Sequence, residues 1–451
     1  MTHLHGIVRL ALLVGAAIVG GIVDPLASHA ATRPPNVLII LTDDQRVGTL
    51  GVMPRTVQFF RNRGRMFTRG FVTTPLCCPS RSSIFTGLYA HNHRVLTNGG
   101  HSLPQNVTVQ RYLHDAGYRT AIVGKYLNSW PLELNPPYFD RWATGGGDSY
   151  HDPKFNVDGT VRTLRGYTTD IVASKAVRLL QGFEATDSQP WFLYLAPKAP
   201  HLPATPAPEY AQAPVSEWAK NPAVLESDRR DKPPWVQDGT VSQDWVRRTR
   251  ADQLRTLRSV DDLVGRVART LGTLGERRRT IAFFLSDNGF LWGEHGLTNK
   301  SHPYTHSIKV PFLLRWPGHL ASGSRDWRYA TNVDLAPTIL DAAGISPGAP
   351  MDGKSLLRSW ARNRLFTEFF RPGDRSGVPG WASVRTKRMQ YVEYYDRDRS
   401  HVIFREYYRL DQDPWQLTNL LRDGNPANNP DTARLHRLLR IYRACGGSAC
   451  P

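Results

Sequence analysis

Hydrophobic and polar residues alternate along this chain in two patterns, one typical of buried strands and the other of amphipathic helices. Apolar runs that indicate buried strands recur at residues 36–42, 120–123, 191–196, 280–286 and 310–315. Apolar residues at helical spacing lie between them, at residues 54–62, 107–116, 168–183, 245–274 and 332–343. Strands that alternate with helices predict an α/β domain, with a mostly parallel sheet flanked by helices.

The pattern changes after about residue 353. Short aromatic-rich strands separated by turns are expected at residues 366–370, 382–385, 390–395 and 405–410, followed by a helix at residues 433–444. We therefore predict a first domain at residues 31–355 and a C-terminal subdomain at residues 356–451 with a small antiparallel sheet. Residues 203–235, rich in proline, alanine and charge, are expected to form a long loop, which in a compact domain is often functional.

The N-terminal residues have the pattern of a secretory signal peptide. Arg9 precedes an apolar run at residues 11–23, and Ser28 and Ala30 provide small residues for cleavage. We expect a signal peptide of residues 1–30, removed after Ala30, and a secreted or extracytoplasmic protein. The alternative is a retained anchor, but the run is short for a membrane span. We therefore expect no stable membrane association.

A net charge of +18 predicts attraction to polyanions, including nucleic acids, anionic lipids and sulfated glycans. The arginines are scattered along the chain rather than gathered in a basic arm, and the motifs of nucleic-acid-binding folds are absent from the sequence. We expect no nucleic-acid partner. The plain alternative is a basic surface without a specific partner.

Four cysteines occur as two close pairs. Cys77 and Cys78 are adjacent, and a disulfide between neighbours is strained. Cys445 and Cys450 close a short loop at the end of the chain, and an exported protein can keep such a disulfide. We therefore expect one disulfide, Cys445–Cys450, and another role for the first pair.

Side chains that carry oxygen directly follow two of the predicted strands. Asp43 and Asp44 come after the first strand, and Asp287 and Asn288 come after residues 280–286. Ligands of open α/β sheets bind at the carboxyl ends of the strands, and oxygen donors suit calcium or magnesium better than zinc. A single acid in this position is more often a cap or turn former, but two pairs favour a cation site.

Cys77 begins a stretch with the features of a helix start. Pro79, Ser80 and Ser82 are all typical near the first turn of a helix. A helix N-terminus favours a nearby anion and lowers the pKa of a thiol. On residue types alone, Cys77 is therefore a candidate thiol nucleophile.

The segment Cys77-x-Pro79-x-Arg81, followed by Thr86-Gly87, resembles the signature of the sulfatase family. In that family the first cysteine of the motif is oxidised to formylglycine (3-oxoalanine). The resemblance therefore implies this group at position 77, with a formylglycine-generating enzyme as a partner during maturation.

Other segments resemble the same family in the same order, namely residues 118–125, 199–203, 286–289, 293–300 and 411–420. The resemblance covers nearly all of residues 36–420. It implies the alkaline-phosphatase-like α/β fold, one bound calcium and hydrolysis of sulfate esters.

The resemblance also implies roles for individual residues. The expected catalytic residues are Cys77, Arg81, Lys125, His201 and Lys300, and the expected calcium ligands are Asp43, Asp44, Cys77, Asp287 and Asn288. The hydrated aldehyde would attack sulfur while Arg81, Lys125 and Lys300 bind the sulfuryl oxygens. His201 is the candidate acid for the leaving oxygen, with Lys300 as the rival. Lys125, His201, Lys300 and Asn128 are the expected substrate contacts.

Two positions depart from the pattern of many sulfatases. Leu127 stands where many members have a histidine, and Thr305 stands where many have a glutamate. However, Cys-Cys-Pro-Ser-Arg and Gly-Lys-Tyr-Leu-Asn resemble the N-acetylglucosamine-6-sulfatase branch. That branch implies a 6-O-sulfated, glucosamine-type glycan as substrate.

Two alternatives stay open. A phosphate or phosphonate monoester hydrolase could use the same formylglycine, because both monoesters are tetrahedral and differ mainly in charge. A catalytically dead polyanion-binding protein would account for the charge of +18 but not for the intact set of site residues.

Overall fold

A ten-stranded mixed sheet forms the centre of the protein, in the order β12-β2-β11-β8-β1-β7-β3-β4-β5-β6. The computed structural model describes residues 1–3, 6, 33–147, 149–186, 188–370 and 377–451, so nearly all of the expected signal peptide, residues 1–30, lies outside the described residues. The strands are β1 (Asn36–Thr42), β2 (Arg65–Phe71), β3 (Arg119–Gly124), β4 (Arg141–Gly145), β5 (Lys154–Val157), β6 (Thr160–Thr163), β7 (Trp191–Ala196), β8 (Thr280–Ser286), β11 (Phe312–Arg315) and β12 (Ser324–Thr331).

The five central strands, from β8 to β4, run parallel to one another. β11 is antiparallel to β8 and β2, and β5 and β6 add an antiparallel edge. Every residue of β1, β7 and β8 is buried, because helices cover both faces. This is the physical reason for the continuous apolar runs, and it confirms the predicted mostly parallel sheet.

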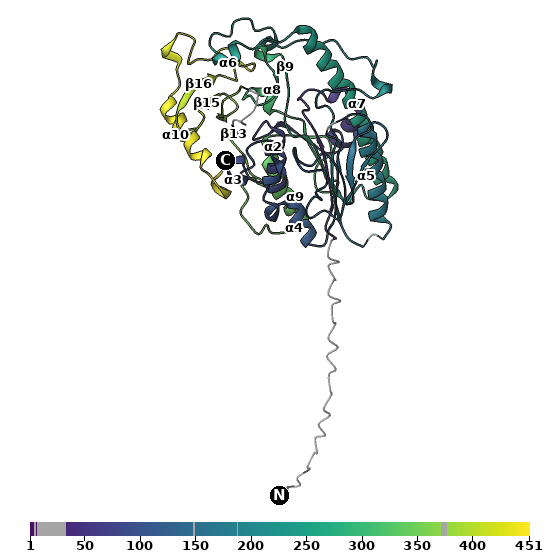
Figure 1. The fold of residues 1–451 in the computed structure, drawn as a ribbon. Helices are drawn as coiled ribbons and strands as arrows, with labels where there is room; N and C mark the ends of the chain where they lie inside the picture. The colour runs from purple at the N-terminus through teal and green to yellow at the C-terminus, as the bar shows by residue number, and fades with distance from the viewer. Residues whose placement is uncertain (4–5, 7–32, 148, 187, 371–376) are drawn as a thin grey trace. The chain divides into compact units, whose positions relative to one another are not determined.

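Alternate residues of β1 enter two different cores. Leu38 and Ile40 pack with the helices α5 (Thr168–Glu184) and α7 (Gln243–Thr273) on one face. Val37, Ile39 and Leu41 pack on the other face, against the helices α2 (Cys77–Thr86), α4 (Val109–Asp115) and α9 (Leu335–Ala343). Figure 1 shows the two helical layers on opposite sides of the sheet. A strand exposes successive side chains to opposite faces, so β1 joins both layers.

A second, antiparallel sheet follows in the order β13-β14-β15-β16. Its strands are β13 (Leu365–Phe369), β14 (Trp381–Arg385), β15 (Gln390–Tyr395) and β16 (Val402–Tyr408), and α10 (Thr432–Arg443) comes after them. This confirms the predicted small sheet. Both sheets belong to one compact unit, Pro34–Pro451, and the division at residue 355 stays a prediction.

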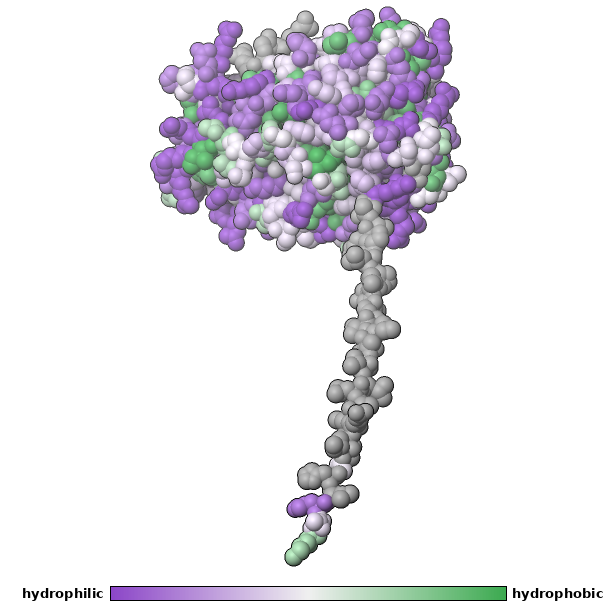
Figure 2. Space-filling model, turned by 90° about the horizontal axis from the view of Figure 1, so that it is seen from below, coloured by the Kyte–Doolittle hydropathy of each residue, from purple (hydrophilic) through white to green (hydrophobic). Residues whose placement is uncertain are grey.

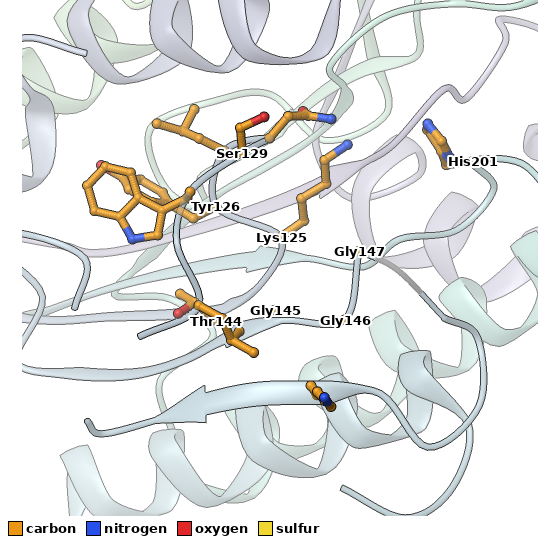
Figure 3. A pocket seen from close by; sticks show the side chains of 13 residues that line it. Lys125, Tyr126, Ser129, Thr144, Gly145, Gly146, Gly147 and His201 are labelled. Atoms are coloured by element: carbon orange, nitrogen blue, oxygen red, sulfur yellow. The ribbon is translucent and has the colours of Figure 1, made fainter. Parts of the chain in front are cut away.

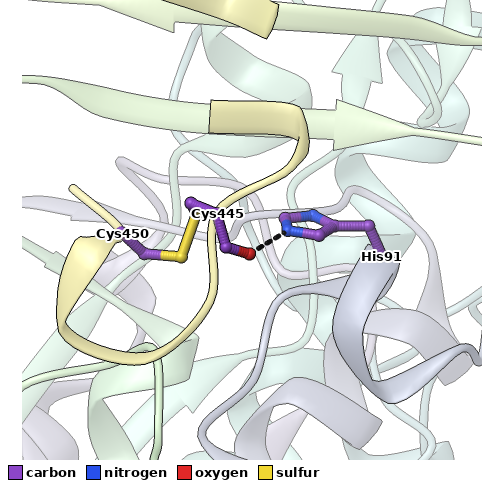
Figure 4. Close-up of side chains that lie close together, drawn as sticks. All are labelled: His91, Cys445 and Cys450. Carbon is purple, nitrogen blue, oxygen red and sulfur yellow. Dashed lines mark hydrogen bonds between the residues drawn. A yellow bond between two sulfur atoms is a disulfide. The ribbon is translucent and has the colours of Figure 1, made fainter. Parts of the chain in front are cut away.

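The end of the chain is held by a disulfide between Cys445 and Cys450. His91, in the short helix α3 (Ala90–His93), lies beside it, and Nε2 of His91 is 2.9 Å from the carbonyl oxygen of Cys445 (Figure 4). Both sulfurs are used in the disulfide, so this group of three residues does not offer thiolate ligands.

Several strands were not predicted from the sequence because they carry many polar residues. β2, β6 and β12 read RMFTRGF, TVRT and SRDWRYAT, and they lie at or near the two edges of the sheet. The remaining short elements are α1 (Pro54–Thr56), which continues into a π turn, α6 (Pro234–Gln237), α8 (Thr305–Ile308), β9 (Leu291–Trp292) and β10 (Thr298–Asn299). The predicted loop at 203–235 contains short helical turns only.

Among the described residues, none of the helices is both long enough and apolar enough to cross a membrane. The face shown in Figure 2 is covered mainly by hydrophilic side chains, with apolar ones in small, separate groups. Such a surface is ordinary for a globular domain.

Candidate active site

The carboxyl ends of the parallel strands bring the expected site residues together. Asp43 and Asp44 follow β1, Lys125 follows β3, and Asp287 follows β8. His201 lies in the loop after β7. Because these strands are neighbours and run in the same direction, their following loops meet at one edge of the sheet. The structure thus gathers residues that are far apart in the sequence.

Helix α2 brings Cys77 and Arg81 to the same place. Cys77 is the first residue of α2, and the whole helix is buried. The prediction of a lowered thiol pKa is wrong: burial, followed by the charge of Asp43, raises the pKa of Cys77 well above its usual value. The helix N-terminus does not outweigh the loss of water around a thiol that is only 1% exposed.

Three cationic side chains surround Cys77 and the acids. Nζ of Lys300 donates to Sγ of Cys77 at 3.0 Å and also contacts Asp44. Nζ of Lys125 donates to Oδ2 of Asp43 at 2.5 Å. Nε of Arg81 donates to Oδ2 of Asp287 at 2.8 Å, with further contacts to the carboxylate of Asp43 and the carbonyl of Lys125.

These charges control the ionisation of Asp43. Its burial alone would raise its pKa, but Lys125, His201, Arg81 and Lys300 together hold that pKa well below the usual value. Asp287 differs, since burial and the neighbouring charge of Asp43 raise its pKa despite the cations. Two buried carboxylates in one site are therefore balanced unequally by the same set of cations.

The oxygen donors fit a hard cation. Asn288 donates from Nδ2 to Oδ1 of Asp44 at 2.6 Å, while its own Oδ1 is buried and has no hydrogen-bond partner among the described residues. The backbone N–H of Asp44 donates to Oδ1 of Asp287 at 3.2 Å. Donor atoms of Asp43, Asp44, Cys77 and His201 lie within 4.8 Å of one another. A buried oxygen without a partner beside clustered carboxylates suits calcium or magnesium.

His201 lies beside these acids. The sequence predicted it as a catalytic residue and substrate contact, but not as a metal ligand. Its Nε2 is 3.8 Å from Oδ2 of Asp44, and its Nδ1 is 2.7 Å from the carbonyl oxygen of Leu202. The hydroxyl of Tyr150 donates to the carbonyl oxygen of His201 at 2.6 Å, and this supporting contact was not predicted from the sequence. Tyr150 lies in a segment without a periodic pattern, so no signal pointed to it.

A pocket of 420 Å³ opens beside the site, lined by Lys125, Asn128, Trp130, Lys154 and His201 among others. Figure 3 shows Lys125 and His201 among the side chains that line it, with the end of β4 and the glycines that follow it below Lys125. The volume falls in the range of roughly 300–1,000 Å³ that is usual for small-molecule sites. A ligand bound in this pocket would therefore lie beside both Lys125 and His201.

Asn128 lines this pocket, but its atoms also hold the second cysteine. The backbone N–H of Asn128 donates to Sγ of Cys78 at 2.9 Å, and Oδ1 of Asn128 is 3.6 Å from the same sulfur.

The two positions that depart from the family pattern have structural partners elsewhere. Leu127 is buried in the core, and Thr305 donates to the side-chain oxygen of Gln416.

Known proteins resemble this chain over most of its length. The family model described as Sulfatase matches residues 35–345, and the model of the C-terminal part of N-sulphoglucosamine sulphohydrolase matches residues 293–443. An extracellular sulfatase homologue from Caenorhabditis elegans is 35% identical over 351 aligned positions, and the alignment covers 73% of this chain and 49% of that protein. The chain thus spans about half the length of that relative.

Human N-acetylglucosamine-6-sulfatase is 30% identical over 503 aligned residues, covering 96% of this chain and 89% of the human protein. A protein solved in complex with its substrate D-glucosamine-2-N,6-O-disulfate superimposes with a TM-score of 0.76 at 24% identity, covering 90% of this chain and 97% of the other. This last likeness concerns the fold alone. The family match, which covers more than half of the chain, assigns it: the protein belongs to the sulfatase family.

Proposed function

We propose that the protein hydrolyses sulfate monoesters at the site around residue 77, and that Cys77 is converted to formylglycine during maturation. The observation that carries the proposal is the gathering of Arg81, Lys125 and Lys300 around Cys77 at the edge that also holds the acids. A tetrahedral oxyanion placed there would meet all three cations. Membership of the sulfatase family supports the same reaction.

Two groups complete the proposed chemistry. The hydrated aldehyde of formylglycine supplies the hydroxyl that reacts with sulfur. A bound calcium ion supplies Lewis-acid polarisation, with Asp43, Asp44, Asp287, Asn288 and an oxygen at position 77 as its ligands.

The chain's own residues bind and orient the ester. Lys125 and Lys300 have side chains that are 9% and 8% exposed, so little water weakens their attraction to the sulfuryl oxygens. Arg81 donates hydrogen bonds to Asp287 and to the backbone carbonyl of Lys125. These bonds fix helix α2 against the loop that follows β3. Positioned charges of this kind need no reorganisation when charge develops in the transition state.

His201 is the proposed acid for the leaving oxygen. Its Nδ1 faces the carbonyl oxygen of Leu202, which orients the ring, and its Nε2 lies 3.8 Å from Oδ2 of Asp44. His201 also lines the pocket. Lys300 stays the rival because it also reaches residue 77. Activity of His201→Ala on an ester with a good leaving group, compared with one that has a poor leaving group, separates the two, since only loss of the acid penalises the poor leaving group selectively.

The proposed substrate is a 6-O-sulfated, glucosamine-type glycan. The named activity of the human relative supports this choice, and the 420 Å³ pocket beside Lys125 has room for the sugar. We further propose that the protein is exported, in line with the extracellular relative, and that a formylglycine-generating enzyme acts on it.

The proposal is tested by mass spectrometry and kinetics on the same preparation. The peptide that carries residue 77 should have the mass of the aldehyde, and kcat/KM for an aryl sulfate should exceed the values for the matched aryl phosphate and aryl phosphonate. Cys77→Ala should fold but not turn over. Full activity from protein whose Cys77 is an unmodified thiol would refute the formylglycine, and preference for the phosphorus esters would refute sulfate as the natural group.

A further inference from the structure

A second pocket, of 510 Å³, opens between the loop after β1, the 203–235 loop and helix α7. We propose that this arginine pocket, named after Arg46, Arg250 and Arg258 in its walls, binds an anionic sugar residue of the glycan that carries the scissile sulfate. The substrate is then an oligosaccharide. This inference rests on the proposed function, and it adds a subsite whose residues have no part in the chemistry.

The charge of the arginine pocket is not balanced by its own walls. Among the described residues, no aspartate or glutamate lines it. Nη1 of Arg46 forms an ion pair with Oε1 of Glu294 at 2.6 Å. Glu294 is buried and does not line the pocket. Arg250 and Arg258 form no ion pair with a described carboxylate, and Nε of each is buried without a hydrogen-bond partner. The pocket therefore offers two guanidinium groups to an incoming anion.

Of the two arginines, Arg250 gives the stronger support for an anion site. It is only 9% exposed, and its guanidinium donates from Nη2 to the backbone carbonyl of Ser216 at 3.1 Å. Burial, and after it the charge of Arg46, lowers the pKa of Arg250. A buried guanidinium without a counter-ion carries a desolvation cost, and a carboxylate or sulfate in the pocket would offset it through charge-assisted hydrogen bonds.

Tryptophans give the pocket the second property of a sugar site. Trp218, Trp292 and Trp415 line it, and the rings of Trp218 and Trp292 meet edge to face at 5.9 Å. The guanidinium of Arg250 lies 5.6 and 5.8 Å from those two rings. Trp292 is buried, but Trp218 and Trp415 are partly exposed, so their indole rings offer apolar area for the C–H face of a pyranose, which a free inorganic anion would not use. Cations beside aromatic faces therefore favour an anionic sugar.

The arginine pocket and the active site share their loops. Arg46 follows Asp44 and Gln45 directly, and Trp292 belongs to β9, shortly after Asn288. In the sheet, β1 and β8 lie on one side of β7, whereas β3, which carries Lys125 of the first pocket, lies on the other. A glycan of several residues can therefore extend from the first pocket, past residue 77, toward the arginine pocket.

Three esters, each with a single 6-O-sulfate, test the inference on wild-type protein. They are a glucosamine monosaccharide, a chitotetraose with neutral neighbouring sugars, and a heparosan tetrasaccharide whose neighbouring sugars are uronates. A heparin-derived tetrasaccharide adds sulfated neighbours, which separates recognition of sulfate from recognition of carboxylate. The variants are Arg250→Gln and Arg258→Gln. Arg248→Gln is the matched control, because Arg248 is an exposed arginine of the same helix.

We expect Arg250→Gln to lower kcat/KM on an anionic tetrasaccharide by about tenfold or more, through KM, because a hydrogen bond to a charged group is lost. Activity on the monosaccharide and the chitotetraose should stay within about twofold, as should every activity of Arg248→Gln. Equal effects of Arg250→Gln on all substrates, or no effect on any, would overturn the inference. If Arg250→Gln does not fold, Arg258→Gln carries the same comparison.

A binding measurement keeps this inference separate from the proposed function. Unsulfated heparosan tetrasaccharide should quench the tryptophan fluorescence of Cys77→Ala, and Arg250→Gln should abolish the quenching. If wild type hydrolyses none of the esters but this binding persists, the proposed function fails and the subsite stands. If the tetrasaccharide does not bind while the monosaccharide ester is hydrolysed, the subsite is refuted and the proposed function stands.

Discussion

The ammonium group of Lys300 lies 3.0 Å from Sγ of Cys77, although 223 positions separate the two residues in the sequence. The same ammonium group contacts Asp44. A residue of the loop after β10 thus joins the start of helix α2 to the end of β1. An anion bound at residue 77 would share this cation with the acids.

Replacing Lys300 with alanine should lower kcat by about 10²–10³-fold, as for removal of one positioned donor from an oxyanion site. The change in KM should be smaller if the contact strengthens in the transition state. Steady-state kinetics on a sulfate ester measure this, with Lys387→Ala, an exposed lysine, as control. A kcat within about threefold of wild type would contradict the role given to Lys300.

Calcium should stabilise the folded protein, and Asn288 should be needed for the full effect. Protein treated with a chelator should gain about 2.7 kcal/mol at a calcium concentration of about 100 Kd, read as a rise in Tm. In Asn288→Ala the rise should shrink, because one buried oxygen is removed from the ligand set.

Asn419→Ala is the matched control for this experiment, since Asn419 is also fully buried but bonds to Tyr407 and Asp231. It should lower Tm yet keep the calcium response. A calcium response in Asn288→Ala as large as that of wild type would contradict the proposed ligand. A larger rise in Tm with magnesium than with calcium would identify magnesium as the ion that the site prefers.

His91 should stabilise the fold more in acid than in base. Burial alone would lower its pKa, but Glu368, 2.8 Å from Nδ1, and the carbonyl of Cys445 raise it above the usual value of 6.5. A raised folded pKa means that this stability is complete below the unfolded pKa and is lost as pH rises through the folded pKa. His91→Gln should therefore cost about 2 kcal/mol below pH ~6 and less in alkaline buffer.

Denaturant unfolding of wild type and His91→Gln across pH measures this difference. His101→Gln, at an exposed position, is the control and should show no such trend. If His91→Gln destabilises the protein more as pH rises, the predicted pH dependence of the contribution of His91 is wrong.

The disulfide between Cys445 and Cys450 should be dispensable for catalysis. It closes a short loop, so the chain-entropy estimate of its stabilisation is about 2 kcal/mol. The double serine variant should lose roughly that amount of unfolding free energy and keep its kcat. A folded double variant with a strongly reduced kcat would show that the disulfide loop is needed for catalysis and would contradict this expectation.

Much of the fold follows from local sequence pattern. Strands β1, β7 and β8 are buried at every position and largely apolar because both of their faces are covered, and helices α5 and α7 show the periodicity of one buried side. The strands β2, β6 and β12 were missed for the complementary reason. At the edges of the sheet, polar side chains can reach water, so the apolar signal is diluted.

The sequence by itself determined which residues are candidates for the site, because the motif around Cys77 and the acids after β1 and β8 form short contiguous segments. Only the tertiary structure decided how they act on one another. It placed His201 beside Asp44, raised the thiol pKa of Cys77 by burial, and left Arg250 without a counter-ion among the described residues. Local pattern depends on neighbours a few positions away, whereas burial and charge pairing depend on which strands lie side by side and on the loops that join them.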